Sequence, residues 1–521
     1  MMTAFLDSIG YGQWILHALI VIPLAGMIAI ALGSAAAAKR TALVVTTIEF
    51  ILSIGLWWAV DTAPGTLQLV SSTPWIPGWG IHYRLGIDGI SLFMVLLTTM
   101  LLPLCVLSSW TYIAKQEKGY YALLLALTTG VIGVFLALDL FVFYVFWELM
   151  LIPMYFLIGI WGGGNRHYAA FKFFLYTMAG SLLMLVAIIY TAWWVRVQTG
   201  VWSFAYEHLQ GQSLAISTVA VLPFMAFALA FAIKVPIFPF HTWLPDAHVE
   251  APTAGSVLLA AVLLKMGTYG FLRFANPIFP YAAMSWGVSY TMIGLGVIGV
   301  VYGALVAMVQ PDVKKLVAYS SVSHLGFVIL GLWAGTVQGV QGALMVMIGH
   351  GLSTGALFFL IGMLYERRHT REISAFGGIA RVMPLFSAAF VITALASIGL
   401  PGLSGFVGEF LVLIGTFARY PWATAVATTG VIFAAAYLLW ALQRMLFEKL
   451  DKPENEKLLD LNLREVVVLL PLLLGMIWLG LYPKPVLDKM EPASRKYIEH
   501  LRIAEPVAGN TAIRATAGGP Q

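Results

Sequence analysis

Apolar stretches long enough to cross a bilayer recur along the whole of this 521-residue chain. A helix of roughly 20 apolar residues spans the hydrocarbon core, and the chain contains about 14 such stretches. Hydrophobic residues make up 60% of the sequence and charged residues 10%, against roughly a quarter charged residues in soluble domains. Continuous apolar runs indicate helices, because the strands of a membrane barrel alternate polar and apolar residues. The sequence therefore predicts an all-α polytopic membrane protein.

The predicted spans follow one another with short connections. Their approximate ranges are 14–33, 41–60, 89–110, 121–137, 140–160, 172–194, 214–237, 252–273, 284–308, 316–334, 341–364, 384–417, 422–444 and 465–482. The run 384–417 is too long and too rich in proline and glycine for one straight helix, so we expect a broken span there.

Lysine and arginine residues gather in every second predicted loop, as Lys314, Lys315, Arg367 and Arg368 do. Cytoplasmic loops of membrane proteins carry such an excess of basic residues. The pattern predicts that both termini lie on the side of the membrane opposite the cytoplasm. It also accounts for the net charge of +5 without any binding of nucleic acid.

Two of the predicted spans are interrupted, and they lie five spans apart. Pro236 and Pro239 follow Lys234 in the seventh span, and Pro401 with Gly402 interrupts the twelfth. Proline cannot continue the helical hydrogen-bond ladder, and the freed carbonyls need water or protein partners inside a membrane. Two such breaks predict two inverted five-helix repeats, with a hydrated cavity beside Lys234. A kink that serves only packing is the alternative.

Four charged residues stand out within the predicted spans, and they are Glu148, Lys234, Lys265 and Glu409. A charge inside a bilayer is costly and therefore indicates function. The structural alternative is a side chain that reaches the interface or seals a helix contact. A carboxylate roughly 5 Å from a buried lysine stabilises its charged form by around 3 kcal/mol at an effective dielectric of about 20. Moving the carboxylate away would favour release of the proton, as a pump requires.

Four histidines extend this set as candidate proton relays, and they are His241, His248, His324 and His350. A neutral imidazole accepts a hydrogen bond on one nitrogen and donates on the other. Hydrogen bonds between helices without proton transfer are the alternative. His241, Asp246 and His248 imitate a metal cluster, but the prolines and the irregular spacing argue against it, so we expect no metal.

Cofactor sites are not expected in this chain. Cys105 is the single cysteine of the sequence, which excludes an iron–sulfur cluster, a cysteine-based zinc site and an internal disulfide. No glycine loop that could hold a phosphate follows a predicted strand. The glycine-rich segment GWGIHYRLGIDGISL opens a span, where we expect Asp88 to cap a helix.

Six segments of the sequence together resemble one family. They are LGIDGISL, FWELMLIPMYFLIGIWG, KVPIFPFHTWLPDAHVEAPTAGSVLLAAVLLKMGTYG, KKLVAYSSVSHLGF, GHGLSTGALFFLIGMLYER and LPGLSGFVGEF. They are similar to motifs of the antiporter-like membrane subunits of respiratory complex I, the NADH–quinone oxidoreductase, over roughly residues 75–480. Most branches of that family carry a lysine at the position of Glu409, whereas the M type, the counterpart of mitochondrial subunit 4, carries a glutamate.

The resemblance implies a proton-translocating subunit that couples quinone reduction elsewhere in the complex to proton pumping. It implies that Glu148 and Lys234 form the charge pair of a first half-channel, that Lys265 connects the halves, and that Glu409 is the last carrier of the second half. The implied partners are neighbouring membrane-arm subunits, lipids and protons. NADH, FMN, iron–sulfur clusters and quinone are expected on other subunits. An Mrp-type cation–proton antiporter subunit and a membrane-bound hydrogenase arm are the alternatives.

The same resemblance suggests four parts of the chain. Residues 1–120 would form about three N-terminal spans, 121–274 the first antiporter-like half-channel, 284–447 the second, and 448–521 a cytoplasmic loop, the last span and a polar tail. Because the sequence turns polar after Pro483, we expect a short surface helix there and then disorder.

Overall fold

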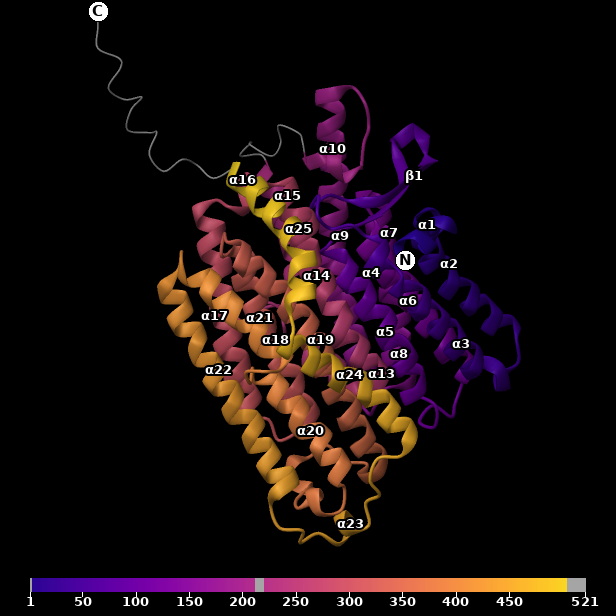
Figure 1. Ribbon diagram of the computed structural model, residues 1–521, viewed down its shortest axis with the longest axis vertical. Coiled ribbons are helices and arrows are strands. Elements are labelled where there is room, and N and C mark those ends of the chain that lie inside the picture. The colour runs from indigo at the N-terminus through magenta and orange to yellow at the C-terminus, as the bar shows by residue number, and fades with distance from the viewer. Residues whose placement is uncertain (1, 211–219, 504–521) are drawn as a thin grey trace, which may run out of the picture.

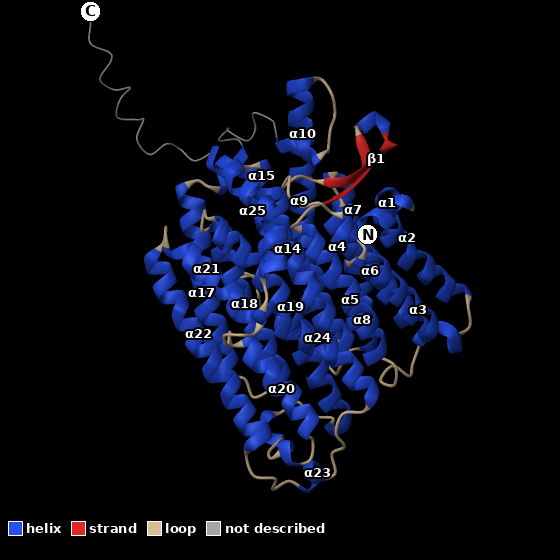
Figure 2. Ribbon diagram, in the orientation of Figure 1, coloured by secondary structure: helices blue, strands red, loops and turns tan. Residues whose placement is uncertain are grey.

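The computed structural model describes residues 2–210 and 220–503, and helices make up most of it (Figures 1 and 2). Twelve helices or helix groups in this part are long and apolar enough to cross a membrane. They are α2 (Tyr11–Leu32), α3 with α4 (Ala35–Ile54, Leu56–Ala59), α5 (Ser91–Ser108), α6 (Glu117–Leu136), α7 with α8 (Leu140–Leu149, Leu151–Trp161), α9 (Arg166–Thr199), α13 to α15 (Thr253–Leu258, Leu264–Gly270, Asn276–Ile278), α17 (Trp286–Met308), α18 (Val313–Trp333), α19 (Val337–Arg368), α22 (Pro421–Leu442) and α24 (Leu463–Leu481).

Three shorter apolar helices occupy the two predicted broken spans. They are α11 (Val221–Lys234), α20 (Pro384–Ser397) and α21 (Ser404–Phe417). The remaining helices are α1 (Met2–Ser8), α10 (Tyr206–Gln210), α12 (Trp243–Glu250), α16 (Pro280–Ala283), α23 (Pro453–Glu456) and α25 (Lys484–Ile503). The polytopic helical fold is therefore confirmed. The total of about 14 crossings and the inverted repeat stay predictions, and the predicted start of the seventh span, 214–219, lies outside the described residues.

Both predicted interruptions lie where the proline and glycine residues place them. The first helix ends at Lys234 and α12 begins only at Trp243, and the second break separates Ser397 from Ser404. Gly399 and Gly402 have φ angles of +76° and +92°, a region that residues with a side chain rarely adopt. The second break thus depends on glycine as well as on proline.

A further junction divides the fifth span at Met150, between α7 and α8. Pro153 lies one turn into α8 and has no N–H group to donate to the carbonyl of Leu149. The junction lies two residues after Glu148, so this carboxylate lies near the end of a half-helix rather than within a continuous one.

The helix group Thr253–Ile278 contains two π-helical turns, Leu259–Leu263 and Phe271–Ala275. The apolar window of this group is completely buried, so it forms the centre of the helix bundle. π turns are rare and occur frequently at functional sites. The first of them comes immediately before the turn that carries Lys265.

One element was not predicted from the sequence, an antiparallel hairpin of β1 (Gln68–Ile76) and β2 (Ile81–Ile87) (Figure 2). Its residues include the β-branched and aromatic types that favour strands, and a turn of Pro77–Trp79 and Gly80 joins them. The hairpin lies at the end of the molecule opposite α23 (Figure 1).

The loops around α23 gather basic residues that are distant in sequence. Arg367 forms an ion pair with Glu465 at 2.7 Å, and Lys452 donates to the carbonyl of Phe376 at 2.7 Å. This end of the molecule contains the loops that the charge pattern predicts to be cytoplasmic. The predicted surface helix after Pro483 is present as α25, and the predicted disordered tail from residue 504 lies outside the described residues.

Candidate functional site

A row of four ionisable side chains crosses the second half of the helix bundle. The Lys265 ammonium lies 2.6 Å from Nδ1 of His350, and the rings of His350 and His324 have centroids 5.5 Å apart. Nδ1 of His324 lies 2.9 Å from Oε1 of Glu409. None of the four is more than 6% exposed, so the row runs through the interior of the protein. Four separate elements, α14, α19, α18 and α21, supply these residues.

The Lys265 ammonium is held by two acceptors. It donates to Nδ1 of His350 and, at 2.6 Å, to the carbonyl of Ala260 in the first π turn. Because Nδ1 of His350 accepts this hydrogen bond, the neutral ring carries its proton on Nε2. Nε2 has no protein partner among the described residues.

A small cavity adjoins the two histidines and Glu409. Its volume of about 10 Å³ provides room for roughly one water molecule. Ser353 and Ser397 also line it, so polar groups surround the space. A water molecule there would have histidine, serine and carboxylate partners.

The loop between α20 and α21 approaches the Glu409 carboxylate closely. A Cβ atom placed on Gly399 would lie 2.8 Å from Oε2 of Glu409. Glycine at this position therefore serves both the left-handed backbone and the space that the carboxylate occupies.

Glu148 and Lys234 do not touch each other. The Lys234 side chain is 1% exposed, and its ammonium contacts the sulfur of Met150 at 3.4 Å. It also lies 5.5 Å from the ring centroid of Trp147 and 5.4 Å from that of Phe173. Within residues 2–210 and 220–503 the structure shows no ion pair between Glu148 and Lys234, although their charges interact electrostatically.

Protein groups satisfy the carbonyls that the first break releases. The Trp243 indole donates to the carbonyl of Ile233 at 2.9 Å, and the Ile237 N–H donates to the carbonyl of Ala232 at 2.9 Å. These carbonyls do not require water. A hydrated cavity beside Lys234 stays a prediction that this geometry does not need.

The two lysines lie on elements that pack directly against each other. A Cβ atom placed on Gly267, two residues after Lys265, would lie 3.1 Å from Cβ of Lys234 and 2.9 Å from the carbonyl of Phe231. Only glycine permits this approach of α14 to the end of α11. The contact joins the first half of the candidate site to the row in the second half.

His241 and His248 lie outside the row. The His248 ring stacks on Phe358 with a centroid distance of 4.7 Å, and the His241 ring lies 5.2 Å from that of Tyr302. Asp246, the third residue of the metal cluster that the sequence imitates, forms an ion pair with Lys172 at 2.7 Å. In the described part of the chain, no group of three His, Cys, Asp or Glu side chains could hold a metal ion.

Arg273 lies inside the candidate span Thr253–Ile278 and pairs with Asp88 at 2.6 Å. The Asp88 carboxylate also accepts hydrogen bonds from the N–H groups of Ile90 and Ser91, which agrees with the expected cap. Burial raises the pKa of Asp88, but Arg273 and these N–H groups outweigh it and hold the pKa below its usual value. No sequence signal linked two residues so far apart.

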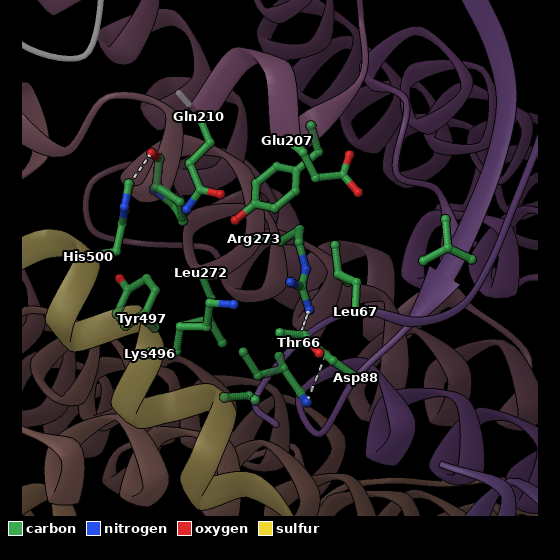
Figure 3. A pocket seen from close by; sticks show the side chains of 16 residues that line it. Thr66, Leu67, Asp88, Glu207, Gln210, Leu272, Arg273, Lys496, Tyr497 and His500 are labelled. Atoms are coloured by element: carbon green, nitrogen blue, oxygen red, sulfur yellow. Dashed lines mark hydrogen bonds and ion pairs between the residues drawn. The ribbon is translucent and has the colours of Figure 1, made fainter. Parts of the chain in front are cut away.

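A polar pocket of about 290 Å³ opens beside this ion pair (Figure 3). Lys496 and His500 of α25 line one side, and Glu207 of α10 lies across from them. In the helix group that carries Arg273, the hydroxyl of Tyr269 accepts a hydrogen bond from Nε of Arg273 at 3.3 Å. Lys265 precedes Tyr269 by one helical turn, so polar side chains continue from the pocket toward the row.

Glu49 is a further buried charge that the sequence analysis missed, although a charge within an apolar run was visible there. Glu49 lies within the predicted span 41–60, and its side chain is 0% exposed on α3. The same reasoning that selected Glu148 applies to it.

Comparison with known proteins agrees with this architecture. Residues 19–136 match the model of the amino terminus of NADH-ubiquinone oxidoreductase chain 4, and residues 137–434 match that of the NADH:quinone oxidoreductase/Mrp antiporter transmembrane family. NADH-quinone oxidoreductase subunit M of Rhodobacter capsulatus is 46% identical over 91% of this chain and 94% of that protein. The chain belongs to the subunit M/chain 4 family.

Solved structures related to this family have the same fold. A chain in respiratory complex I from Thermus thermophilus with bound NADH has a TM-score of 0.85 and 33% identity, covering 93% of this chain and 99% of that one. A chain of the Mrp complex from Dietzia sp. DQ12-45-1b has a TM-score of 0.82 at 20% identity, covering 94% and 99%, which shows likeness of fold alone. The resemblance of the six motifs to the subunit M family is thus confirmed.

Proposed function

We propose that this chain is a proton-translocating subunit of the membrane arm of an NADH–quinone oxidoreductase. The observation that carries the proposal is the row Lys265–His350–His324–Glu409, four proton-binding side chains in contact or near contact inside a member of the subunit M family. The chain would lie in a bacterial inner membrane with both termini periplasmic. Neighbouring membrane-arm subunits would be its partners, and the redox cofactors would be held by other subunits.

The geometry supports a sequence of proton transfers along the row. Lys265 gives a proton to Nδ1 of His350 across the 2.6 Å contact. His350 then releases the proton on Nε2, through the small cavity, to His324. The Nδ1–H of His324 passes a proton to Oε1 of Glu409 across 2.9 Å. Each ring ends in the tautomer opposite to its starting one and must turn or be reloaded before the next proton.

Glu148 and Lys234 would load the row from the first half. The ammonium of Lys234 lies among Met150, Trp147 and Phe173, so its positive charge has no direct anionic partner. A shift of Glu148 toward Lys234 would stabilise the bound proton, and a shift away would favour its transfer toward Lys265. Quinone chemistry in other subunits would drive these shifts through the neighbouring chains. His241 and His248 make no hydrogen bond to a described residue of the row. They would act where protons enter the first half.

The experiment that tests this proposal uses inverted membrane vesicles from a strain whose complex carries Lys234→Met. After a native gel confirms assembly, NADH–quinone turnover and NADH-driven acidification are recorded together. We expect both rates to fall about tenfold or more, because methionine keeps the length of the side chain and cannot hold a proton. Unchanged rates would contradict the proposal. Sodium–proton exchange by the same vesicles would then support an Mrp-type function, and the exposed Lys457→Met is the control.

Gly399→Ala tests whether Glu409 works in its observed position. The added methyl group would meet Oε2 of Glu409 at 2.8 Å and is expected to push the carboxylate away from His324. Gly402→Ala is a matched control, since its φ is also positive but the nearest atom to the new Cβ lies 3.8 Å away. We expect acidification to fall several-fold further in Gly399→Ala than in Gly402→Ala. Equal losses would mean that backbone strain alone, about 1–2 kcal/mol per residue, explains both.

A further inference from the structure

Glu49 is a buried carboxyl group that the proposed proton route does not use. It lies on α3 near the middle of the candidate span Ala35–Ala59. Within the described residues, neither Oε1 nor Oε2 has a hydrogen-bond partner, and the side chain forms no ion pair. A charged residue in this position is costly to a membrane protein.

The face of α3 that carries Glu49 is polar, whereas the opposite face is apolar. Every fully buried residue of the helix is small or polar, namely Ala38, Ala42, Thr46, Glu49 and Ser53. Val44, Ile48 and Ile51 are between 46% and 61% exposed, as a surface toward lipid requires. The helix therefore turns a polar seam toward its neighbours α2, α5 and α6.

Hydroxyl groups accompany Glu49 along this seam. Thr46, Glu49 and Ser53 follow at intervals of three and four residues, which places them on one face. The Thr46 hydroxyl donates to the carbonyl of Ala42 at 2.8 Å, and the Ser53 hydroxyl lies 2.7 Å from that of Thr99 on α5. A carboxyl group retained only for packing would likewise hydrogen-bond to a carbonyl or a hydroxyl, and Glu49 makes no such bond to a described residue.

No described group compensates a negative charge on Glu49. The ionisable residues of the three helices packed against α3 are His17 and Tyr11 on α2, Cys105 on α5, and Glu117, Lys118, Tyr120 and Tyr121 on α6. Glu117 lies beside Lys39, and Lys118 donates to the carbonyl of Ala31. Tyr11 donates to the carbonyl of Leu52, and Tyr120 bonds to Ser109. An uncompensated buried carboxylate neutralises itself by taking up a proton.

We propose that Glu49 is a proton-binding site separate from the two half-channels. Its carboxyl group is protonated in the membrane, and the proton exchanges with water rather than being sealed within the protein. The proposal does not rest on the proposed function, because a bound proton can be detected without turnover or pumping.

The test is infrared difference spectroscopy on the intact purified complex, wild type against Glu49→Gln. A protonated carboxyl group has a carbonyl band distinct from those of carboxylate, and the band shifts in D2O when the proton exchanges. We expect the variant to lose one such band throughout the neutral pH range, and we expect that band to shift in D2O. Glu117→Gln is the matched control, and it should lose carboxylate bands only, because Glu117 lies 4.0 Å from Lys39.

Two results would overturn the proposal. Loss of carboxylate bands in Glu49→Gln would show that Glu49 is ionised. Loss of an acid band that does not shift in D2O would show a sealed structural acid rather than an exchangeable proton site. If Glu49→Gln does not assemble, Glu49→Asp supplies the difference spectrum, since the two acids absorb at different frequencies.

Discussion

Replacing Lys265 with methionine is expected to lower NADH–quinone turnover and NADH-driven acidification together by about tenfold or more, which corresponds to about 1.4 kcal/mol per factor of ten. Methionine has nearly the same length and fills the same space. It removes the ammonium that contacts Nδ1 of His350 and the carbonyl of Ala260, each at 2.6 Å. The measurement is the paired record of turnover and acidification in inverted vesicles, with assembly confirmed on a native gel.

The companion variant Lys265→Arg separates charge from proton transfer. Arginine keeps a positive charge in the row but does not release a proton in a protein. We therefore expect Lys265→Arg to be as inactive as Lys265→Met, while Lys457→Met on an exposed loop keeps the wild-type rates. An arginine variant that pumps normally would show that the row needs only a fixed charge, and the proposed transfer from Lys265 to His350 would be wrong.

The second large effect concerns Glu148, the carboxylate proposed to pair with Lys234. Glu148→Ala removes it, whereas Glu148→Asp keeps a carboxylate on a side chain one methylene shorter. If it moves to about 5 Å from the Lys234 ammonium, the carboxylate stabilises that charge by around 3 kcal/mol at an effective dielectric of about 20, roughly a hundredfold in the ratio of the protonated and deprotonated forms of the lysine. We expect Glu148→Ala to lose about tenfold or more of the pumping rate and Glu148→Asp to keep a large part of it.

This comparison is read from the initial rate of acidification per unit of assembled complex. Glu454→Ala on α23 is the control, because that side chain is exposed at the far end of the molecule. Equal activity of the alanine and aspartate variants would refute the pairing of Glu148 with Lys234. The observed position of the Lys234 ammonium, 3.4 Å from the sulfur of Met150, would then be its working position.

Much of the fold was predictable because a bilayer restricts the backbone structures that can span it. Apolar length alone located the long helices, and Pro401 with Gly402 correctly marked the break between α20 and α21. The hairpin of β1 and β2 escaped notice, since a short strand pair outside the membrane carries no comparable signal. The junction at Met150 was also missed, although Pro153 indicated it in the same way as the other prolines.

The candidate site was predictable in its members but not in its connections. Lys265 and Glu409 were visible as charges in apolar runs, and His324 and His350 as polar residues between them. Lys265 and His350 are 85 residues apart, and so are His324 and Glu409. Their contacts arise from the packing of four elements, which periodicity along one segment cannot reveal. Glu49 was overlooked although the same signal, a charge within an apolar run, was present in the sequence.

The π turn before Lys265 makes the length of this helix as important as its composition. Each π turn accommodates one residue more than an α-helical turn, so deleting a residue from Leu259–Leu263 would let the segment close into a regular helix. The downstream residues would then keep their place, and the Lys265 ammonium would still face His350. Loss of a residue from a regular α-helical turn would instead rotate everything after it by about 100° and carry the ammonium away without any change in charge. Homologues of this chain should therefore be aligned with gaps allowed within the π turn, and a gap elsewhere in this helix would move the lysine to another face.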